Sequence, residues 1–341
     1  MKIIVTGGCG YIGSHTVVEL QKCGYETVIA DNLCNSGTEV LNGIAKITGI
    51  KPEFHDIDLT DKQAASDFFK THADAAAVIH FAALKAVGES VFKPVDYYYN
   101  NLNSLIRVIE GMRENGIKNI VFSSSCTVYG QAEQLPVTES TPRKPAESPY
   151  GNTKSVCEDI LRDAAIAYPE LKTLALRYFN PIGAHPSAEI GELPNGIPNN
   201  LIPYLTQTVA GIRKELSVFG DDYNTPDGSP IRDYIDITDL AKAHTAGIER
   251  LISGKNKAAY EYFNIGTGKG LSVLEIIRAF ERATGKKVNY KIAERRAGDI
   301  EKIWADTSLA NKELDWKAVT PIEETLANAW KWQKKITPSS L

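Results

Sequence analysis

The chain has 341 residues, which is enough for one large α/β unit or two modest domains with a substantial core. Hydrophobic residues make up 43% and charged residues 23%, a composition typical of globular rather than disordered proteins. The formal net charge is −4 and there is no Lys/Arg-rich block. We therefore expect no nucleic-acid partner, although this composition does not exclude local anion-binding pockets.

The start of the chain, MKIIVTGGCG, has too short an apolar run for a signal peptide, and nowhere do eighteen apolar residues follow one another. We expect a cytoplasmic protein without a membrane partner. Five cysteines without a CxxC pair indicate reduced thiols rather than disulfides or a zinc site. The six histidines show no regularly spaced Cys or carboxylate partner, so we expect structural histidines and no metal.

In the first half, short β-rich runs alternate with helical stretches, which predicts parallel βαβ units in a Rossmann-type doubly wound sheet. The mostly apolar runs indicate strands that helices cover on both faces. The predicted strands are 2–6, 27–30, 76–82, 119–125 and 173–179.

Pro and Gly become frequent after Asn180, which indicates a smaller, loop-rich, mixed α/β domain. Ser272 and Glu275 form a predicted capping box for a later helix, which ends before Gly285. The strand-like residues 260–266 suggest a return to the main sheet. We expect residues 1–180 to form a Rossmann domain, with a contribution from about 237–265, and 181–341 to form most of an interleaved second domain.

Directly after the first predicted strand, Gly7, Gly10 and Gly13 form a GxxGxxG turn that leads into a helical pattern. Glycines let the backbone approach a pyrophosphate, and the helix N-terminus offers free N–H groups. The turn alone is weak evidence, because many loops contain three glycines. Asp31 ends the second strand, where it can bind an adenosine ribose diol and repel a 2′-phosphate. Together these features predict binding of NAD rather than NADP.

Ser148 and Pro149 are typical of a helix start, and Tyr150 and Lys154 follow four residues apart on one helical face. The lysine ammonium is expected to favour a phenolate and to lower the pKa of Tyr150, which makes the tyrosine a usable base. Taken alone, such a pair is common on helix surfaces.

A serine-rich segment, FSSSCTVYG at 122–130, lies at the end of a predicted central strand, where α/β sheets place ligands. Such serines can also merely cap turns. Together with the helical pair, Ser125, Tyr150 and Lys154 form a set suited to proton transfer beside a hydride acceptor.

The segments GGCGYIGSH, SSS-T-VYG and YGNTK resemble the extended short-chain dehydrogenase/reductase family. Further segments resemble the UDP-galactose 4-epimerases within it, namely FAALKAVGES, YYYNN, RYFNPIGAHPS, GIPNNL, RDYIDI and RRAGD. The resemblance runs from Met1 to about Trp332. It implies a bound NAD cofactor and reversible C4 epimerisation of UDP-galactose and UDP-glucose through a 4-keto sugar and transient NADH.

The resemblance also implies roles for individual residues. Tyr150 would take the proton of the sugar 4-hydroxyl, Lys154 would also hold the nicotinamide ribose, and Ser125 would orient the 4-oxygen. The implied cofactor-binding residues are Gly7, Gly10, Tyr11, Ile12, Gly13, Asp31, Asn32, Asp58, Leu59, Phe81, Ala82, Lys85, Asn100, Ser123, Tyr150, Lys154 and Tyr178. The implied UDP-sugar-binding residues are Lys85, Ser125, Thr127, Tyr150, Asn180, Asn200, Leu201, Phe219, Arg232, Arg296, Asp299 and Ile303. A homodimer through helices near 101–114 and 153–167 is implied as well.

Three positions depart from the family pattern. Ala83 replaces a usual Gly and Cys126 a usual Ala, and both changes are small. Ile303 stands where many members carry a Tyr that narrows the sugar pocket. The hypothesis is that UDP-N-acetylglucosamine and UDP-N-acetylgalactosamine are also substrates; the alternative is that Ile303 is packed core.

Two rival functions make different demands on the sequence. A nucleotide-sugar 4,6-dehydratase needs an acidic pair for elimination, and none lies beside Thr127. A non-catalytic NAD sensor would keep the glycine turn and Asp31 without needing Tyr150 or Lys154. The presence of all these residues together favours the epimerase.

Overall fold

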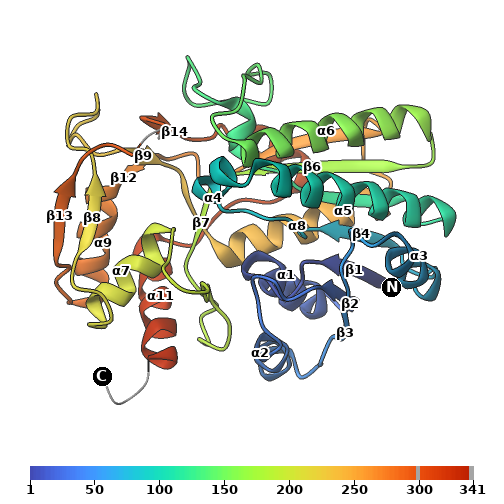
Figure 1. Cartoon of the computed structure of the whole chain (residues 1–341), viewed down its shortest axis with the longest axis horizontal. Helices are drawn as coiled ribbons and strands as arrows, with labels where there is room; N and C mark the ends of the chain where they lie inside the picture. Colours follow the sequence, from blue (N-terminus) through green and yellow to red (C-terminus); the bar gives the residue numbers. More distant parts are fainter. Residues whose placement is uncertain (297–299, 338–341) are drawn as a thin grey trace.

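The computed structural model describes residues 1–296 and 300–337 (Figure 1). Its largest element is a seven-stranded sheet in the order β11-β6-β5-β4-β1-β2-β3, and every neighbouring pair is parallel. The strands are β1 (Lys2–Thr6), β2 (Glu26–Asp31), β3 (Glu53–Asp56), β4 (Ala77–His80), β5 (Asn119–Ser123), β6 (Lys172–Tyr178) and β11 (Tyr260–Ile265). The predicted Rossmann-type sheet is confirmed, and the five predicted strands are present with ends shifted by no more than two residues.

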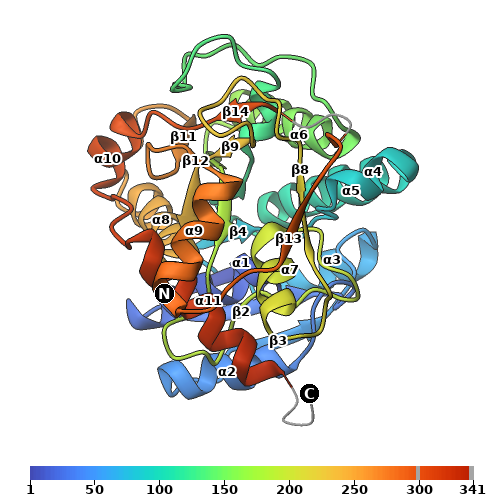
Figure 2. The ribbon, with the colours of Figure 1, turned by 90° about the vertical axis from the view of Figure 1, so that its left-hand side faces the viewer.

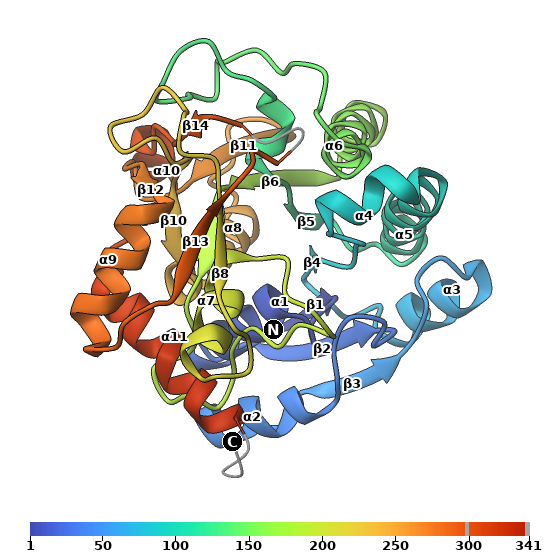
Figure 3. The ribbon, with the colours of Figure 1, turned by 60° about the vertical axis from the view of Figure 1, so that its left-hand side comes forward.

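Helices cover both faces of this sheet (Figure 3). One face carries α1 (Tyr11–Lys22), α2 (Glu39–Thr48) and α8 (Ile237–Ile252); the other carries α3 (Lys62–Thr71), α5 (Pro94–Glu114) and α6 (Pro149–Ala167). In β1, Ile3 and Val5 belong to the same hydrophobic core as Leu240 of α8, whereas Ile4 belongs to the opposite core, with Leu105 of α5. Because successive strand residues point to opposite faces, an apolar run is what a doubly covered strand requires.

The second unit begins where β6 passes into β7 (Asn180–Ile182), which pairs with β10 (Tyr234–Asp236). Its remaining strands are β8 (Leu216–Phe219), β9 (Ile231–Arg232), β12 (Leu271–Ser272), β13 (Tyr290–Ala293) and β14 (Lys302–Ile303). Its helices are α7 (Leu201–Val209), α9 (Val273–Thr284) and α11 (Ile322–Ile336), and they share a core that includes Phe280 and Leu326 (Figure 2). The predicted capping box of Ser272 and Glu275 is confirmed at the start of α9.

Short elements complete the described chain. They are α4 (Val87–Phe92), the 3-10 helix η1 (Cys126–Tyr129) and α10 (Ser308–Leu314). Between β10 and α9, the chain returns to the large sheet as α8 and its edge strand β11. None of the helices within residues 1–296 and 300–337 has the length and apolar character needed to cross a membrane.

A buried ion pair joins α6 to the sheet. The Arg177 guanidinium on β6 donates to both carboxylate oxygens of Glu158 on α6, with Nε–Oε1 2.9 Å and Nη2–Oε2 2.6 Å. Ser124 Oγ donates to the same carboxylate (2.5 Å), as does Tyr260 Oη (3.2 Å). The two charged side chains are 4% and 1% exposed. Each charge is therefore paired and hydrogen-bonded, which is the condition for keeping charges in a low-dielectric interior.

Removing one partner of this pair is expected to be costly. Arg177→Met should lower the free energy of unfolding in urea by about 3–5 kcal/mol, because it leaves the buried Glu158 carboxylate without the two hydrogen bonds and the adjacent charge of the Arg177 guanidinium. Arg162→Met is the matched control on α6: its ion pairs with Asp159 and Asp163 are exposed and should contribute less than about 1 kcal/mol. Equal effects of the two substitutions would contradict this role.

Candidate active site

The glycine turn between β1 and α1 is packed too tightly for side chains. Gly7 has a φ of +68°, and a Cβ added there would lie 2.7 Å from the Ala82 nitrogen. A Cβ at Gly13 would lie 2.3 Å from the Gly7 oxygen. Gly10 caps α1 without a side-chain hydrogen bond, so no side chain competes for the N–H groups of the first turn. The turn therefore offers backbone donors and the positive end of a helix dipole to an anion.

This turn lines a cavity at the carboxyl ends of the parallel strands. All the residues predicted to bind the cofactor line it, namely Gly7, Gly10, Tyr11, Ile12, Gly13, Asp31, Asn32, Asp58, Leu59, Phe81, Ala82, Lys85, Asn100, Ser123, Tyr150, Lys154 and Tyr178. Lining residues that sequence reasoning missed are Ala30, Cys34, Asn35, Ser36, Ile57, Thr60, Ala83 and Ser104. Most of them adjoin predicted positions, so the only available signal was their place in the loops after strands.

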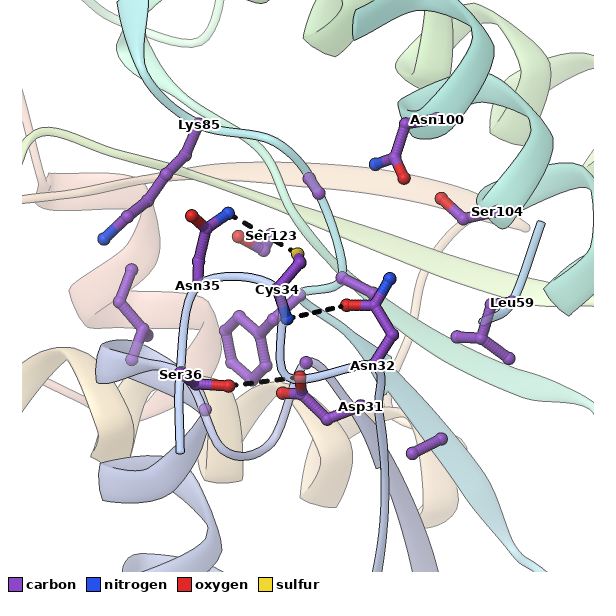
Figure 4. A pocket seen from close by; sticks show the side chains of 18 of the residues that line it. Asp31, Asn32, Cys34, Asn35, Ser36, Leu59, Lys85, Asn100, Ser104 and Ser123 are labelled. Atoms are coloured by element: carbon purple, nitrogen blue, oxygen red, sulfur yellow. Dashed lines mark hydrogen bonds between the residues drawn. The ribbon is translucent and has the colours of Figure 1, made fainter. Parts of the chain in front are cut away.

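Asp31 is held rigidly at one part of this cavity (Figure 4). Its Oδ2 accepts a hydrogen bond from the Cys9 backbone (3.0 Å), and its Oδ1 accepts from the Leu33 backbone (2.9 Å) and from Ser36 Oγ (3.2 Å). Burial raises the pKa of Asp31, and these hydrogen bonds oppose the rise. A fixed carboxylate in this position can accept bonds from a ribose diol but disfavours a 2′-phosphate.

Tyr150 and Lys154 lie on the first turns of α6, where Ser148 accepts a hydrogen bond from the Gly151 backbone as N-cap (3.2 Å). Both side chains reach the same cavity. The Lys154 Nζ donates to the Ser123 carbonyl at 2.6 Å and lies 5.8 Å from the centre of the Tyr150 ring. The lysine is thus anchored to the end of β5 rather than to the phenol.

The expectation that Lys154 lowers the pKa of Tyr150 is wrong for this arrangement. Burial raises the pKa of Tyr150 well above 10, and a hydrogen bond with Ser125 opposes the rise. Burial also lowers the pKa of Lys154 to about 8. The physical reason is desolvation, which penalises both the phenolate and the ammonium in the same apolar setting.

The residues after β5 are fixed by short hydrogen bonds. Ser123 Oγ and Tyr178 Oη share one at 2.7 Å, and Ser125 Oγ accepts from the Thr127 backbone at 3.2 Å as N-cap of η1. Burial raises the pKa of the Cys126 thiol to about 12, so this cysteine stays protonated at neutral pH. Tyr150 lines the cavity, whereas Ser125, which is 7% exposed, is not among the residues that line it.

The predicted UDP-sugar residues fall into small groups. Lys85 and Tyr150 line the cavity with the cofactor set. The Arg296 guanidinium lies 4.3 Å from the centre of the Phe219 ring, and Arg232 on β9 is in register with the buried Ile303 on β14. The others are Thr127 in η1, Asn180 at the start of β7, Asn200 as N-cap of α7 and Leu201 as its first residue. Asp299 lies outside the described residues.

Glu192 was not singled out from the sequence, yet it joins two of these groups. Its Oε1 accepts a hydrogen bond from Asn200 Nδ2 at 2.6 Å and lies 3.9 Å from Lys85 Nζ. Burial raises the pKa of Glu192, and Lys85 and Asn200 oppose the rise. This carboxylate thereby connects the segment after β4 to the loop that precedes α7.

The sequence profile of the NAD dependent epimerase/dehydratase family matches residues 3–266. The chain belongs to this family. It is 51% identical to a UDP-glucose 4-epimerase of Bacillus subtilis over 98% of this chain and 97% of that one. A crystal structure of UDP-glucose 4-epimerase from Bifidobacterium longum in complex with NAD+ and UDP superposes with a TM-score of 0.94 at 46% identity, over 98% of this chain and 99% of that one. The structure of the UDP-Glc/GlcNAc 4-epimerase of Campylobacter jejuni superposes with a TM-score of 0.83 at 35% identity, over 98% of this chain and 99% of that one.

Family membership confirms NAD as the cofactor, and the geometry of this cavity fits it. The glycine turn leaves room for a pyrophosphate, and Asp31 faces the cavity at the end of β2. Lys154 and Tyr178, both buried, reach the cavity from α6 and β6. The polar lining thus matches a dinucleotide with a pyrophosphate, two riboses and no 2′-phosphate.

The lowered pKa of Lys154 predicts a pH-dependent difference in stability. Between pH 8 and 10.5 the unfolded lysine holds a proton that the folded one has released, so wild-type stability rises with pH. Relative to Lys154→Met, the free energy of unfolding in urea should increase by about 2 kcal/mol from pH 7.5 to pH 9.5. If the difference in free energy of unfolding between wild type and Lys154→Met stayed constant over this pH range, the lowered pKa of Lys154 would be contradicted.

Proposed function

We propose that this chain interconverts UDP-galactose and UDP-glucose by inverting C4 of the hexose. The observation that carries the proposal is the convergence of Tyr150, Lys154 and Ser123 on the cavity that the glycine turn and Asp31 also line. A proton-transfer group thus shares a single cavity with the features that fit NAD. The UDP-glucose 4-epimerases that the chain matches over nearly their whole length support the same activity.

When bound, NAD supplies the hydride acceptor and donor for the sugar carbon and a cationic ring whose charge favours a nearby phenolate. The other steps fall to residues of the chain. Tyr150 takes the proton of the 4-hydroxyl and returns it, which requires its pKa to fall from the raised value that burial gives. Ser125 opposes that raised value through its hydrogen bond and orients the 4-oxygen. Lys154, anchored to Ser123, contributes positive charge and holds the nicotinamide ribose.

The UDP portion is expected to bind between the two units of the fold. Arg232 and Arg296 can each bind a phosphate through paired hydrogen bonds, and Phe219 lies against the Arg296 guanidinium. Residues 1–180 with 237–265 would therefore hold NAD, and most of 181–341 would hold the UDP-sugar. Binding through UDP leaves the hexose free to turn, so that either face of C4 can meet the cofactor.

The dehydratase alternative needs acidic groups at the sugar. Among the described residues that line the cavity, the acids are Asp31 and Asp58, which follow β2 and β3 rather than β5. The residues of η1, from Cys126 to Tyr129, contain no carboxylate. Epimerisation is therefore favoured over elimination.

The direct experiment is incubation of the purified protein with UDP-galactose without added NAD. Wild type should form UDP-glucose with its retained cofactor, whereas Tyr150→Phe should lose at least about a hundredfold in turnover and keep its NAD. Bound NAD is measured by release on denaturation. Full activity of Tyr150→Phe, or no product from wild type even with NAD supplied, would contradict the proposal.

Ile303 motivates a broader specificity. The side chain is 1% exposed, packs with Cys126, Val128 and Phe179, and neighbours Arg232 across the β9–β14 pair. Wild type is expected to turn over UDP-N-acetylglucosamine, and Ile303→Tyr should reduce that activity more than the activity on UDP-galactose. Absence of any wild-type turnover of the N-acetylated sugar would remove this part of the proposal.

We also propose a homodimer. Its interface would include the apolar surface of α4 and the start of α5, which precede the expected interface residues 101–114 in the chain. Phe92 is 86% exposed and Val95 is 75% exposed, with Val91 and Tyr99 exposed beside them in sequence. Light scattering after gel filtration should give twice the mass of one chain, and Phe92→Asp should shift it toward the monomer. Val319→Asp, at an exposed position outside these helices, is the control. A monomeric wild type would overturn the proposal.

A further inference from the structure

A second cluster of chemically active side chains lies at the edge of the large sheet, outside the cavity. Glu53 and His55 are two residues apart on the edge strand β3, so they share one face. Their in-register partners on β2, Val28 and Ala30, belong to the core that includes Phe68 of α3. His72 follows the last residue of α3 as its C-cap and is 2% exposed. The strand and the helix end thus bring three potential ligands together.

The three ligand atoms face one another. His55 Nε2 is 2.8 Å from Glu53 Oε1 and 3.1 Å from His72 Nε2, and His72 Nε2 is 3.8 Å from Glu53 Oε1. The two imidazole centres are 4.9 Å apart, so the Nε2 atoms lie on the facing sides of the rings. A circle through the three atoms has a radius of about 1.9 Å, close to zinc–nitrogen and zinc–oxygen bonds of about 2.0–2.2 Å. An ion placed slightly above this plane could therefore bind all three without a large movement.

We propose that Glu53, His55 and His72 form a binding site for a divalent transition-metal ion of the zinc class. Two imidazoles with one carboxylate are typical ligands of zinc, whereas calcium and magnesium prefer oxygen-only sites. Glu53 and His55 are partly exposed, which leaves access for the ion and for a water as fourth ligand. Sequence spacing did not mark this group, because Glu53 and His55 lie on a strand and His72 comes from another element.

The ordinary alternative is a hydrogen-bonded pair of His55 and Glu53 beside a structural His72. That arrangement leaves two imidazole nitrogens facing each other at 3.1 Å with at most one shared proton while both rings are neutral. An ion would engage both nitrogens and the carboxylate at once.

The surroundings also set the expected strength of binding. The Nδ1 of His72 is buried without a hydrogen-bond partner among the described residues. Resident zinc sites hold the second nitrogen of each histidine with such a bond, and its loss typically weakens binding by about 10–100-fold. We therefore expect reversible binding in the micromolar range. The ion would connect β3 to the end of α3. Asp58 and Leu59, which line the cofactor cavity, lie in the segment between these two elements.

The test is titration of the full chain with zinc chloride by calorimetry. The exposed Cys23 and Cys34 can also bind zinc, so both are replaced by serine in every protein used. The protein with both cysteines replaced should bind one equivalent of zinc. Free zinc at a hundredfold excess over Kd should raise its thermal unfolding midpoint by roughly 4 °C. Magnesium chloride should give no binding.

Matched variants assign the site. His55→Ala should weaken zinc binding at least about tenfold, and Glu53→Gln should do the same without altering a histidine. Glu26→Gln removes a carboxylate from the neighbouring strand and should leave binding unchanged. The Glu53→Gln protein keeps the test valid if His55→Ala does not fold. No zinc binding, or equal binding in Glu53→Gln and Glu26→Gln, would overturn the proposal.

Discussion

The position of helix α6 depends on one buried contact, the Glu158–Arg177 ion pair between α6 and β6. Ser124 at the end of β5 and Tyr260 on β11 bind the same carboxylate, so three neighbouring strands of the sheet hold one point of the helix. Glu158 lies one helical turn after Lys154. The fixed end of β5 and the fixed turn of α6 together place the Lys154 ammonium against the Ser123 carbonyl. This anchoring lets two side chains reach the cavity in a defined position.

The same burial sets the electrostatics of the site. Tyr150 is made a weaker acid and Lys154 a weaker base than they are in water, so neither charged form is favoured by the protein alone. Additional positive charge in the cavity would therefore favour the phenolate. We propose that the oxidised cofactor supplies this charge and so assists proton removal from the sugar. Ser125 adds a hydrogen bond that favours the phenolate.

Periodicity and motifs allowed much of this fold to be predicted. The apolar strands β1, β2, β4, β5 and β6, the glycine turn and the caps at Ser148 and Ser272 each carry a local signal, and the structure has all of them. Strand β3, with the sequence EFHD, was missed because four largely polar residues at a sheet edge have no apolar run. The direction of the Tyr150 pKa shift was also missed. Spacing along a helix shows that two side chains share a face, but desolvation depends on the packing of β5, β6 and η1 around them.

Contacts between distant segments were the other limit of the sequence. Glu192 and Asn200, in the loop before α7, meet Lys85 in the segment after β4, and His72 meets Glu53 and His55 through a helix end and an edge strand. No regular spacing marks either group. The family resemblance supplied the UDP-sugar residues, and of these the structure brings Arg296 to Phe219 and Arg232 to Ile303.

We propose that C4 is oxidised and reduced by a cofactor that stays in the cavity while Tyr150 takes up and returns the proton. The most direct test uses UDP-galactose carrying deuterium at C4, converted by the purified enzyme in ordinary water. The UDP-glucose formed should keep the deuterium at C4, since the hydrogen removed from this carbon returns to it without exchange with solvent. Product with ordinary hydrogen at C4 would contradict a retained cofactor as hydride carrier, because it would require exchange of that hydrogen with water.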